Sequence, residues 1–88
     1  MKKEIILDTA KSIVTGERYG TPEQNFHTIA KMWSTYLGVQ IEPKDVCAMM
    51  ILLKVARIAS GHGKEDNWVD VVGYSCLGGE LEEKEGRR

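Results

Sequence analysis

The segment from about residue 43 to residue 60 limits the possible folds more than any other part of the chain. Pro43 suits the first position of a helix, and every residue from Val46 to Leu53 is apolar. A helix that is apolar on nearly all sides has to be buried on nearly all sides. We therefore expect a helix from Pro43 to about Ser60 that lies at the centre of a bundle or in a dimer interface.

The chain has 88 residues, which is enough for one domain. A domain of this size buries only about 60–65% of the surface that its unfolded chain exposes, so an oligomer is a natural way to bury more apolar area. The hydrophobic share of 42% argues against a disordered chain. With a net charge of −1 and no basic stripe, the sequence gives no indication of nucleic-acid binding.

The sequence predicts no membrane segment and no export signal. A membrane span needs about 18 apolar residues, and the run from Val46 to Leu53 is the longest here. The start of the chain leads into a charged helical pattern, which is not a signal peptide. Cys47 and Cys76 both sit in apolar helical patterns, so we expect two reduced core thiols in a cytoplasmic protein without a membrane role.

Three further helices are predicted, over about residues 2–15, 22–37 and 67–77. Thr21 is a good N-cap for the second of these, with Gln24 three residues later as in a capping box. Gly78 and Gly79 are expected to end the last helix. The fold predicted is an all-α, four-helix bundle with a central apolar third helix, as one domain over residues 1–79, followed by a charged, mobile tail over residues 80–88.

The formation of a hydrophobic core does not explain four charged residues in the last two predicted helices. Lys54 and Arg57 lie three apart on one face of the most apolar helix, where burying either charge alone is costly. Asp66 and Asp70 lie four apart, and so on one face of the next helix. If these two helices form an antiparallel hairpin, Arg57 is expected level with Asp70, and Lys54 level with Tyr74.

Two interpretations of these charges stay open. In the first, Arg57 and Asp70 form a salt bridge that fixes the hairpin. In the second, Lys54 and Arg57 bind the phosphate oxygens of a nucleotide. Asp66 and Asp70 then lie near a metal ion such as Mg²⁺.

Three more residues are candidates for ligand binding, each with a plainer alternative. Tyr19 could stack on a base or pack against the second helix. Asn25, in the first turn of that helix, could hydrogen-bond a ligand or face solvent. Trp68 could lie near a base, but it also forms a core-like stripe with Val72 and Cys76. Neither histidine has a partner for nucleophilic catalysis, so no catalytic residue is assigned.

Four motifs follow one another in order: Tyr19–Phe26, Trp33, Met49–Arg57 and Asp66–Tyr74. In this order they resemble a family of short phage and prophage proteins of unknown function, over about residues 5–80. More distantly, the Lys54-x-x-Arg57 helix, the loop and the acidic helix that ends at Gly73-Tyr74 are similar to a phage domain associated with nucleotide modification. That domain is in turn similar to the MazG-like and dimeric dUTPase-like nucleoside triphosphate pyrophosphohydrolases.

The resemblance implies a MazG-like bundle that works as a dimer or tetramer. It also implies Mg²⁺, held by carboxylates on two adjacent helices, and hydrolysis of the α–β phosphate bond of a nucleotide. Those enzymes carry an E-x-x-E pair on one helix and an E-x-x-D pair on the next. Here the acids are Asp66 and Asp70, and the E-x-x-D pair of Glu42 and Asp45 lies at the opposite end of the third helix.

Three functions are consistent with these features. The first is a phage-type, MazG-like nucleotide-binding protein, which as an enzyme would be a Mg²⁺-dependent pyrophosphohydrolase. The second is a non-catalytic protein that sequesters a nucleotide or a nucleotide-derived signal. The third is a structural or regulatory helical oligomer without a ligand. A phage-encoded chain of any of these kinds would work in the host cytoplasm.

Overall fold

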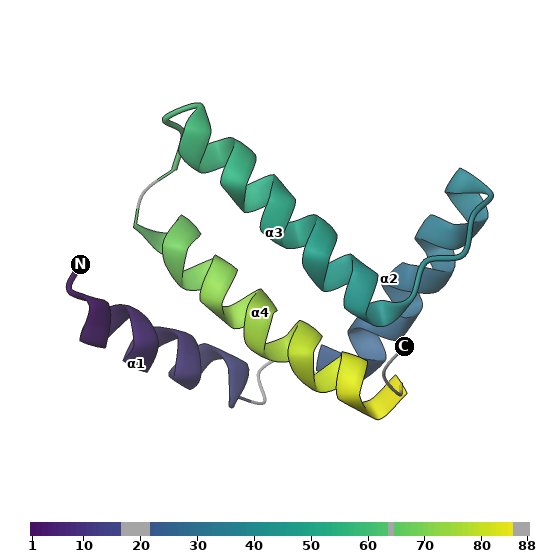
Figure 1. Ribbon diagram of the computed structural model, residues 1–88, viewed down its shortest axis with the longest axis horizontal. Coiled ribbons are helices and arrows are strands. Elements are labelled where there is room, and N and C mark those ends of the chain that lie inside the picture. The colour runs from purple at the N-terminus through teal and green to yellow at the C-terminus, as the bar shows by residue number, and fades with distance from the viewer. Residues whose placement is uncertain (17–21, 64, 86–88) are drawn as a thin grey trace.

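The computed structural model describes residues 1–16, 22–63 and 65–85, and within them the chain is all-α (Figure 1). The helices are α1 (Lys3–Val14), α2 (Pro22–Leu37), α3 (Pro43–Ala59) and α4 (Asp66–Glu85). No strand occurs in these three ranges, which confirms the all-α part of the predicted fold class. The cap predicted at Thr21 lies outside the described residues.

None of the helices in the part of the chain that the structure describes is both long enough and apolar enough to cross a membrane.

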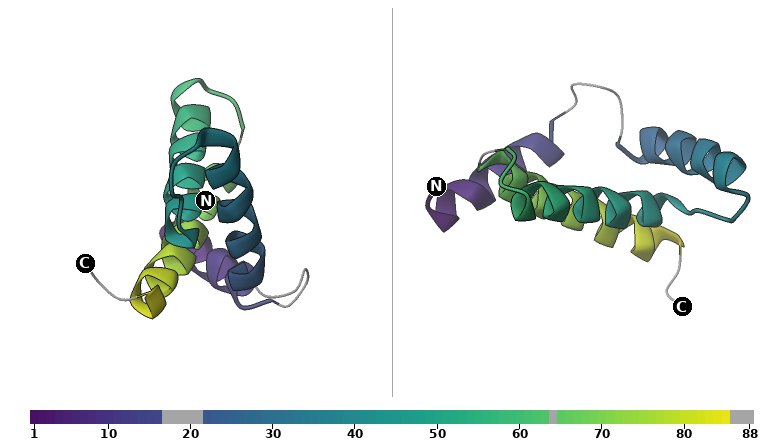
Figure 2. Two further views of the ribbon diagram at one scale, coloured as in Figure 1. Left: turned by 90° about the vertical axis from the view of Figure 1, so that its right-hand side faces the viewer. Right: turned by 90° about the horizontal axis from the view of Figure 1, so that it is seen from above.

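Helix α4 is the element on which the others assemble. It packs against α3 on one side and α1 on the other, and α2 crosses one end of the α3–α4 pair (Figures 1 and 2). Where α1 meets α4, a Cβ atom added at Gly73 would lie 3.4 Å from Cγ1 of Val14. The small residue in α4 therefore lets α1 approach closely.

The hydrophobic core lies where α2 crosses the α3–α4 pair. Phe26 packs against Tyr74 with ring centroids 6.2 Å apart and planes tilted by 58°. This is a favourable arrangement for two aromatic rings. The buried apolar side chains at this crossing are Phe26, Ala30, Val46, Cys47 and Leu81.

The prediction of a central third helix is wrong. Leu52, Leu53 and Val55 of α3 are exposed, and the central position belongs to α4. The apolar content of α3 shows how much surface this helix needs to bury, but it does not show where the helix lies among the others. The central place depends instead on which helix the others pack against, and α4 contacts α1, α2 and α3. Glycines along α4 permit those neighbours.

The predicted end of the fourth helix at Leu77 is also wrong. Helix α4 continues through Gly78 and Gly79 to Glu85, so residues 80–85, which we expected in a mobile tail, are helical. Packing explains the difference. A Cβ atom at Gly78 would lie only 3.0 Å from Cβ of Cys47, so the glycine marks a close helix contact. Leu81 then enters the core one turn later.

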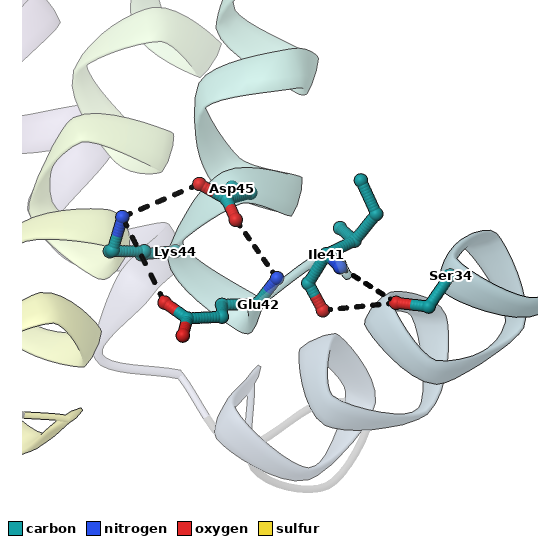
Figure 3. A network of polar contacts seen from close by, with 5 residues as sticks. All are labelled: Ser34, Ile41, Glu42, Lys44 and Asp45. Atoms are coloured by element: carbon teal, nitrogen blue, oxygen red, sulfur yellow. Dashed lines mark hydrogen bonds and ion pairs between the residues drawn. The ribbon is translucent and has the colours of Figure 1, made fainter. Parts of the chain in front are cut away.

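The start of α3 is held by polar contacts to α2 and within its own first turn (Figure 3). The backbone N–H of Glu42 donates to the Asp45 carboxylate at 2.9 Å, as in a capping box. One residue earlier, the backbone N–H of Ile41 donates to Oγ of Ser34 at 2.8 Å. Nζ of Lys44 lies 3.4 Å from Oδ1 of Asp45. The Glu42-x-x-Asp45 pair thus begins a helix.

The two adjacent glycines of α4 give a matched test of this packing. We expect Gly79→Ala to raise the free energy of unfolding by about 0.5–1 kcal/mol, because alanine is the better helix former. A Cβ atom at residue 79 meets nothing within 4 Å. In Gly78→Ala, the added Cβ atom would press against Cys47, so this variant should not show the same gain in stability. Equal effects of both variants in urea unfolding would contradict the close α3–α4 contact.

Candidate functional site

The polar end of the α3–α4 hairpin brings together three of the predicted site residues. Nζ of Lys54 lies 3.0 Å from Oδ2 of Asp70. The two side chains keep 18% and 34% of their surface exposed, so the ion pair lies at the protein surface and is not sealed inside. Arg57 lies one turn further along α3.

Arg57 is positioned by Asn67, a residue that the sequence analysis did not single out. The Nε–H of Arg57 donates to Oδ1 of Asn67 at 3.2 Å. The Asn67 side chain is only 4% exposed, and its Nδ2 donates to the carbonyl oxygen of His62 at 3.0 Å. Gly63 has a φ of 89°, and a Cβ atom there would collide with Nδ2 of Asn67. The loop therefore needs this glycine to admit Asn67.

The predicted pairing of Arg57 with Asp70 is wrong by about one helical turn. Lys54 takes the place opposite Asp70, and Arg57 lies opposite Asn67. Asn67 supplies the physical reason, because it bridges α3 and the loop carbonyl at the mouth of the hairpin. Counting residues from the expected helix ends could not reveal this bridge. An asparagine at the start of the fourth helix, just after a loop with two glycines, was the available sequence signal.

The arrangement leaves binding capacity on both cations. A guanidinium group carries five N–H donors, and the hydrogen bond to Asn67 uses only the Nε–H. The Lys54 ammonium is a flexible point charge that can change partners. Two cations one turn apart at a surface can bind an anion with several oxygens, such as a phosphate chain.

The remaining predicted site residues are not all gathered at this point. Asp66 is exposed in the first turn of α4, on the same face as Asp70. Trp68 is 54% exposed, so its predicted place in the core is wrong. Helical residues two positions apart differ in direction by about 200°. Trp68 and Asp70 therefore project from nearly opposite sides of α4. Tyr19 lies outside the described residues.

Asn25 is an exposed residue of α2, which packs on the other end of the hairpin. The structure therefore assembles Lys54, Arg57 and Asp70, with Asp66 nearby, and it does not bring Trp68 to their side of α4.

Within the three described ranges, no group of three or more histidine, cysteine, aspartate or glutamate side chains is arranged to hold a metal ion. Mg²⁺ is usually bound by one or two carboxylates together with phosphate oxygens. Asp66 and Asp70 could supply two carboxylates, but Asp70 already pairs with Lys54. A metal at this place would therefore share the Asp70 carboxylate with Lys54 or displace the lysine.

A groove lies at the other end of the same hairpin, where Lys44, Asp45 and Glu82 also line it. This groove, of about 310 Å³, runs between the first half of α3 and the second half of α4. Ala48 and Ile51 line one wall, and Ser75 and Gly79 line the other. The sequence signal for this groove was the glycine pair that we interpreted as a helix end.

The two cysteines differ in environment. The Cys47 thiol is buried, and burial, reinforced by the negative charge of Glu85, raises its pKa to about 11. Cys76 is exposed, so only one of the two predicted core thiols lies in the core.

Comparison with known proteins places the chain among phage sequences. A family model described as a domain of unknown function, DUF6378, matches residues 5–82. The Gene 55 protein of Mycobacterium phage L5 is 43% identical over 74 residues, which cover 80% of this chain and 47% of the relative. The Gene 55 protein of Mycobacterium phage D29 is 40% identical over 75 residues, covering 82% and 50%.

The chain spans about half the length of these curated relatives. No solved structure matches it.

Two asparagines test the bridge at the hairpin mouth. We expect Asn67→Ala to lower the free energy of unfolding by about 2 kcal/mol, because it removes two hydrogen bonds and leaves polar groups without partners. The exposed Asn25 is the control, and Asn25→Ala should stay within about 0.5 kcal/mol of the parent. Urea denaturation measures both. A loss for Asn67→Ala no larger than that for Asn25→Ala would refute the bridging role.

The cysteines allow a test by thiol labelling. At pH 8 in the folded protein, we expect a disulfide reagent to modify Cys76 quickly and Cys47 only after unfolding, because the buried thiol stays protonated. Cys76→Ser should remove the fast phase, whereas Cys47→Ser should keep it. Since the folded pKa of Cys47 lies above its ordinary value, its contribution to stability is complete below pH 9 and declines as the pH rises towards 11. Rapid labelling of Cys47 in the folded Cys76→Ser variant would contradict this.

Proposed function

This chain belongs to the DUF6378 family, and we propose that it is a phage-type, MazG-like protein that binds the phosphate groups of a nucleotide at Lys54 and Arg57. One observation carries the proposal. The two cations lie one turn apart at the open end of the hairpin, and each is oriented by a partner on α4. The supporting resemblance to nucleotide-processing helical proteins lies in the same stretch of sequence.

The two cations would act differently. Arg57 is held by Asn67 through its Nε–H, so its other N–H donors are oriented before a ligand arrives. Lys54 would turn from Asp70 to a phosphate oxygen, trading one negatively charged partner for another. This exchange costs little because the ion pair is partly exposed to water.

We propose binding as the primary activity, and hydrolysis only where Mg²⁺ accompanies the nucleotide. Once Lys54 has moved to the phosphates, Asp70 and Asp66 would be available to a metal bound to the same phosphates. The metal would supply charge neutralisation and activate water for attack on phosphorus. Sequestration of a nucleotide or a nucleotide-derived signal requires the two cations alone.

A second candidate function is a structural or regulatory helical oligomer without a ligand. The exposed apolar side chains of α2 and α3 favour it. In that case, Lys54–Asp70 and Arg57–Asn67 only hold the hairpin together.

A thermal-shift screen tests phosphate binding. Pyrophosphate and a set of nucleoside triphosphates are added to the protein with and without Mg²⁺. A ligand at 100 times its Kd stabilises the folded state by about 2.7 kcal/mol, which for a domain of this size raises Tm by about 10 °C or more. Lys54→Ala and Arg57→Ala should each remove most of the shift. Lys31→Ala, which changes an exposed lysine of α2, should keep it.

The variant Asp70→Asn separates the two modes of binding. If binding needs no metal, the loss of the carboxylate frees Lys54, and the shift with pyrophosphate alone should stay or increase. If Mg²⁺ is part of the site, the additional shift caused by Mg²⁺ should disappear. No shift with any phosphate compound, or the same shift in Lys54→Ala as in Lys31→Ala, would overturn the proposal.

A further inference from the structure

The turn that ends α3 is a Schellman motif, and it places His62 next to Arg57. The backbone N–H of His62 donates to the carbonyl oxygen of Arg57 at 3.0 Å, and the N–H of Gly61 donates to that of Ile58 at 3.2 Å. Gly61 has a φ of 74°, as the motif requires. His62 and Arg57 therefore occupy the C″ and C3 positions, whose side chains often make contact in this motif.

The guanidinium group of Arg57 lies against the same loop. A Cβ atom added at Gly63 would be 3.1 Å from Nη2 of Arg57, so the guanidinium group packs beside the residue that follows His62. The carbonyl oxygen of His62 accepts a hydrogen bond from Asn67, the side chain that also accepts from Arg57. The backbone of His62 is thus fixed through both its N–H and its C=O at the edge of the proposed phosphate site.

Ser60 orients the imidazole ring of His62. Nδ1 of His62 lies 3.1 Å from Oγ of Ser60, and this hydroxyl donates its single hydrogen to the carbonyl oxygen of Arg57 at 3.3 Å. The Ser60 oxygen therefore accepts from His62, which assigns the hydrogen of the neutral ring to Nδ1. Nε2 then has a lone pair in the neutral ring and an N–H donor only in the protonated ring. His62 is exposed, and no hydrogen bond joins its Nε2 to another described residue.

We infer that His62 is a third phosphate-binding residue beside Lys54 and Arg57, and that it binds only when its ring is protonated. Histidine is the side chain that commonly changes charge between about pH 5 and 8. The protonated ring supplies a positive charge and the Nε2–H donor, whereas the neutral ring offers a phosphate oxygen only a lone pair. This inference rests on the proposed function, because it concerns the same site.

The charges around His62 couple its protonation to phosphate binding. Among the described residues at this end of the hairpin, the charged side chains are Lys54 and Arg57 of α3, Asp66 and Asp70 of α4, and Glu65, which pairs with the Met1 amine at 2.7 Å. Asp70 and Glu65 each have a cationic partner, and Asp66 is exposed, where water weakens its effect. The neighbouring charge of Arg57 opposes a second cation beside it, and a phosphate bound between the two side chains compensates both.

Pyrophosphate binding at two pH values tests this role with two matched histidine variants. His62→Gln removes the titrating ring but retains both backbone hydrogen bonds, and His27→Gln changes an exposed histidine of α2 as the control. At pH 5.5, calorimetric titration should give His62→Gln a Kd about fivefold weaker than that of the parent, as for one favourable exposed ion pair. At pH 8 the two Kd values should be equal. His27→Gln should match the parent at both pH values, so the protonation of pyrophosphate itself cancels in each comparison.

The variant His62→Lys should show a gain that a purely structural role would not produce. Its positive charge persists at pH 8, so it should bind pyrophosphate more tightly than the parent there. The role of His62 is overturned if His62→Gln binds like His27→Gln at pH 5.5, or if His62→Lys binds no more tightly than the parent at pH 8. In either case, a loss of binding in Lys54→Ala would leave the proposed function standing. A parent that binds no pyrophosphate at either pH would overturn both.

Discussion

The close contact between α3 and α4 is the constraint on which the rest of the structure depends. Gly78 brings α4 against Cys47 with no room for a side chain on that side. This contact sets the register of the hairpin. One end of the pair then presents Val46 and Leu81 to α2 as a core, and the other end places Lys54 opposite Asp70. A shift of one turn would separate both sets of partners.

The hairpin has two ends with different chemistry. At the end near the loop, polar side chains span the helices, and buried Asn67 is satisfied by Arg57 and by the His62 carbonyl. At the other end, α2 completes an apolar core, and polar contacts remain only around the start of α3. A small domain cannot bury all the apolar surface of four helices by itself. Apolar side chains that remain exposed on α2 and α3, such as Tyr36 and Leu52, are the consequence.

The candidate site was identified in part from the sequence. Lys54, Arg57 and Asp70 were recognisable because charged residues next to an apolar helix need partners. Their pairing was not, because it depends on where the helices end and on a bridging asparagine. Trp68 shows the same limit. Its spacing with Val72 and Cys76 is typical of a core stripe, yet the side chain is exposed.

The sequence by itself determined the helical class, the approximate helix positions and the presence of charged residues on the most apolar helix. These properties depend on local periodicity and on caps, which short segments of chain already contain. Only the tertiary structure decided that α4 is central, that Gly78 and Gly79 lie within a helix, and that Lys54 faces Asp70. A glycine ends a helix in isolation but permits close packing when another helix is present. The choice between the two is made by contacts between residues far apart in the chain.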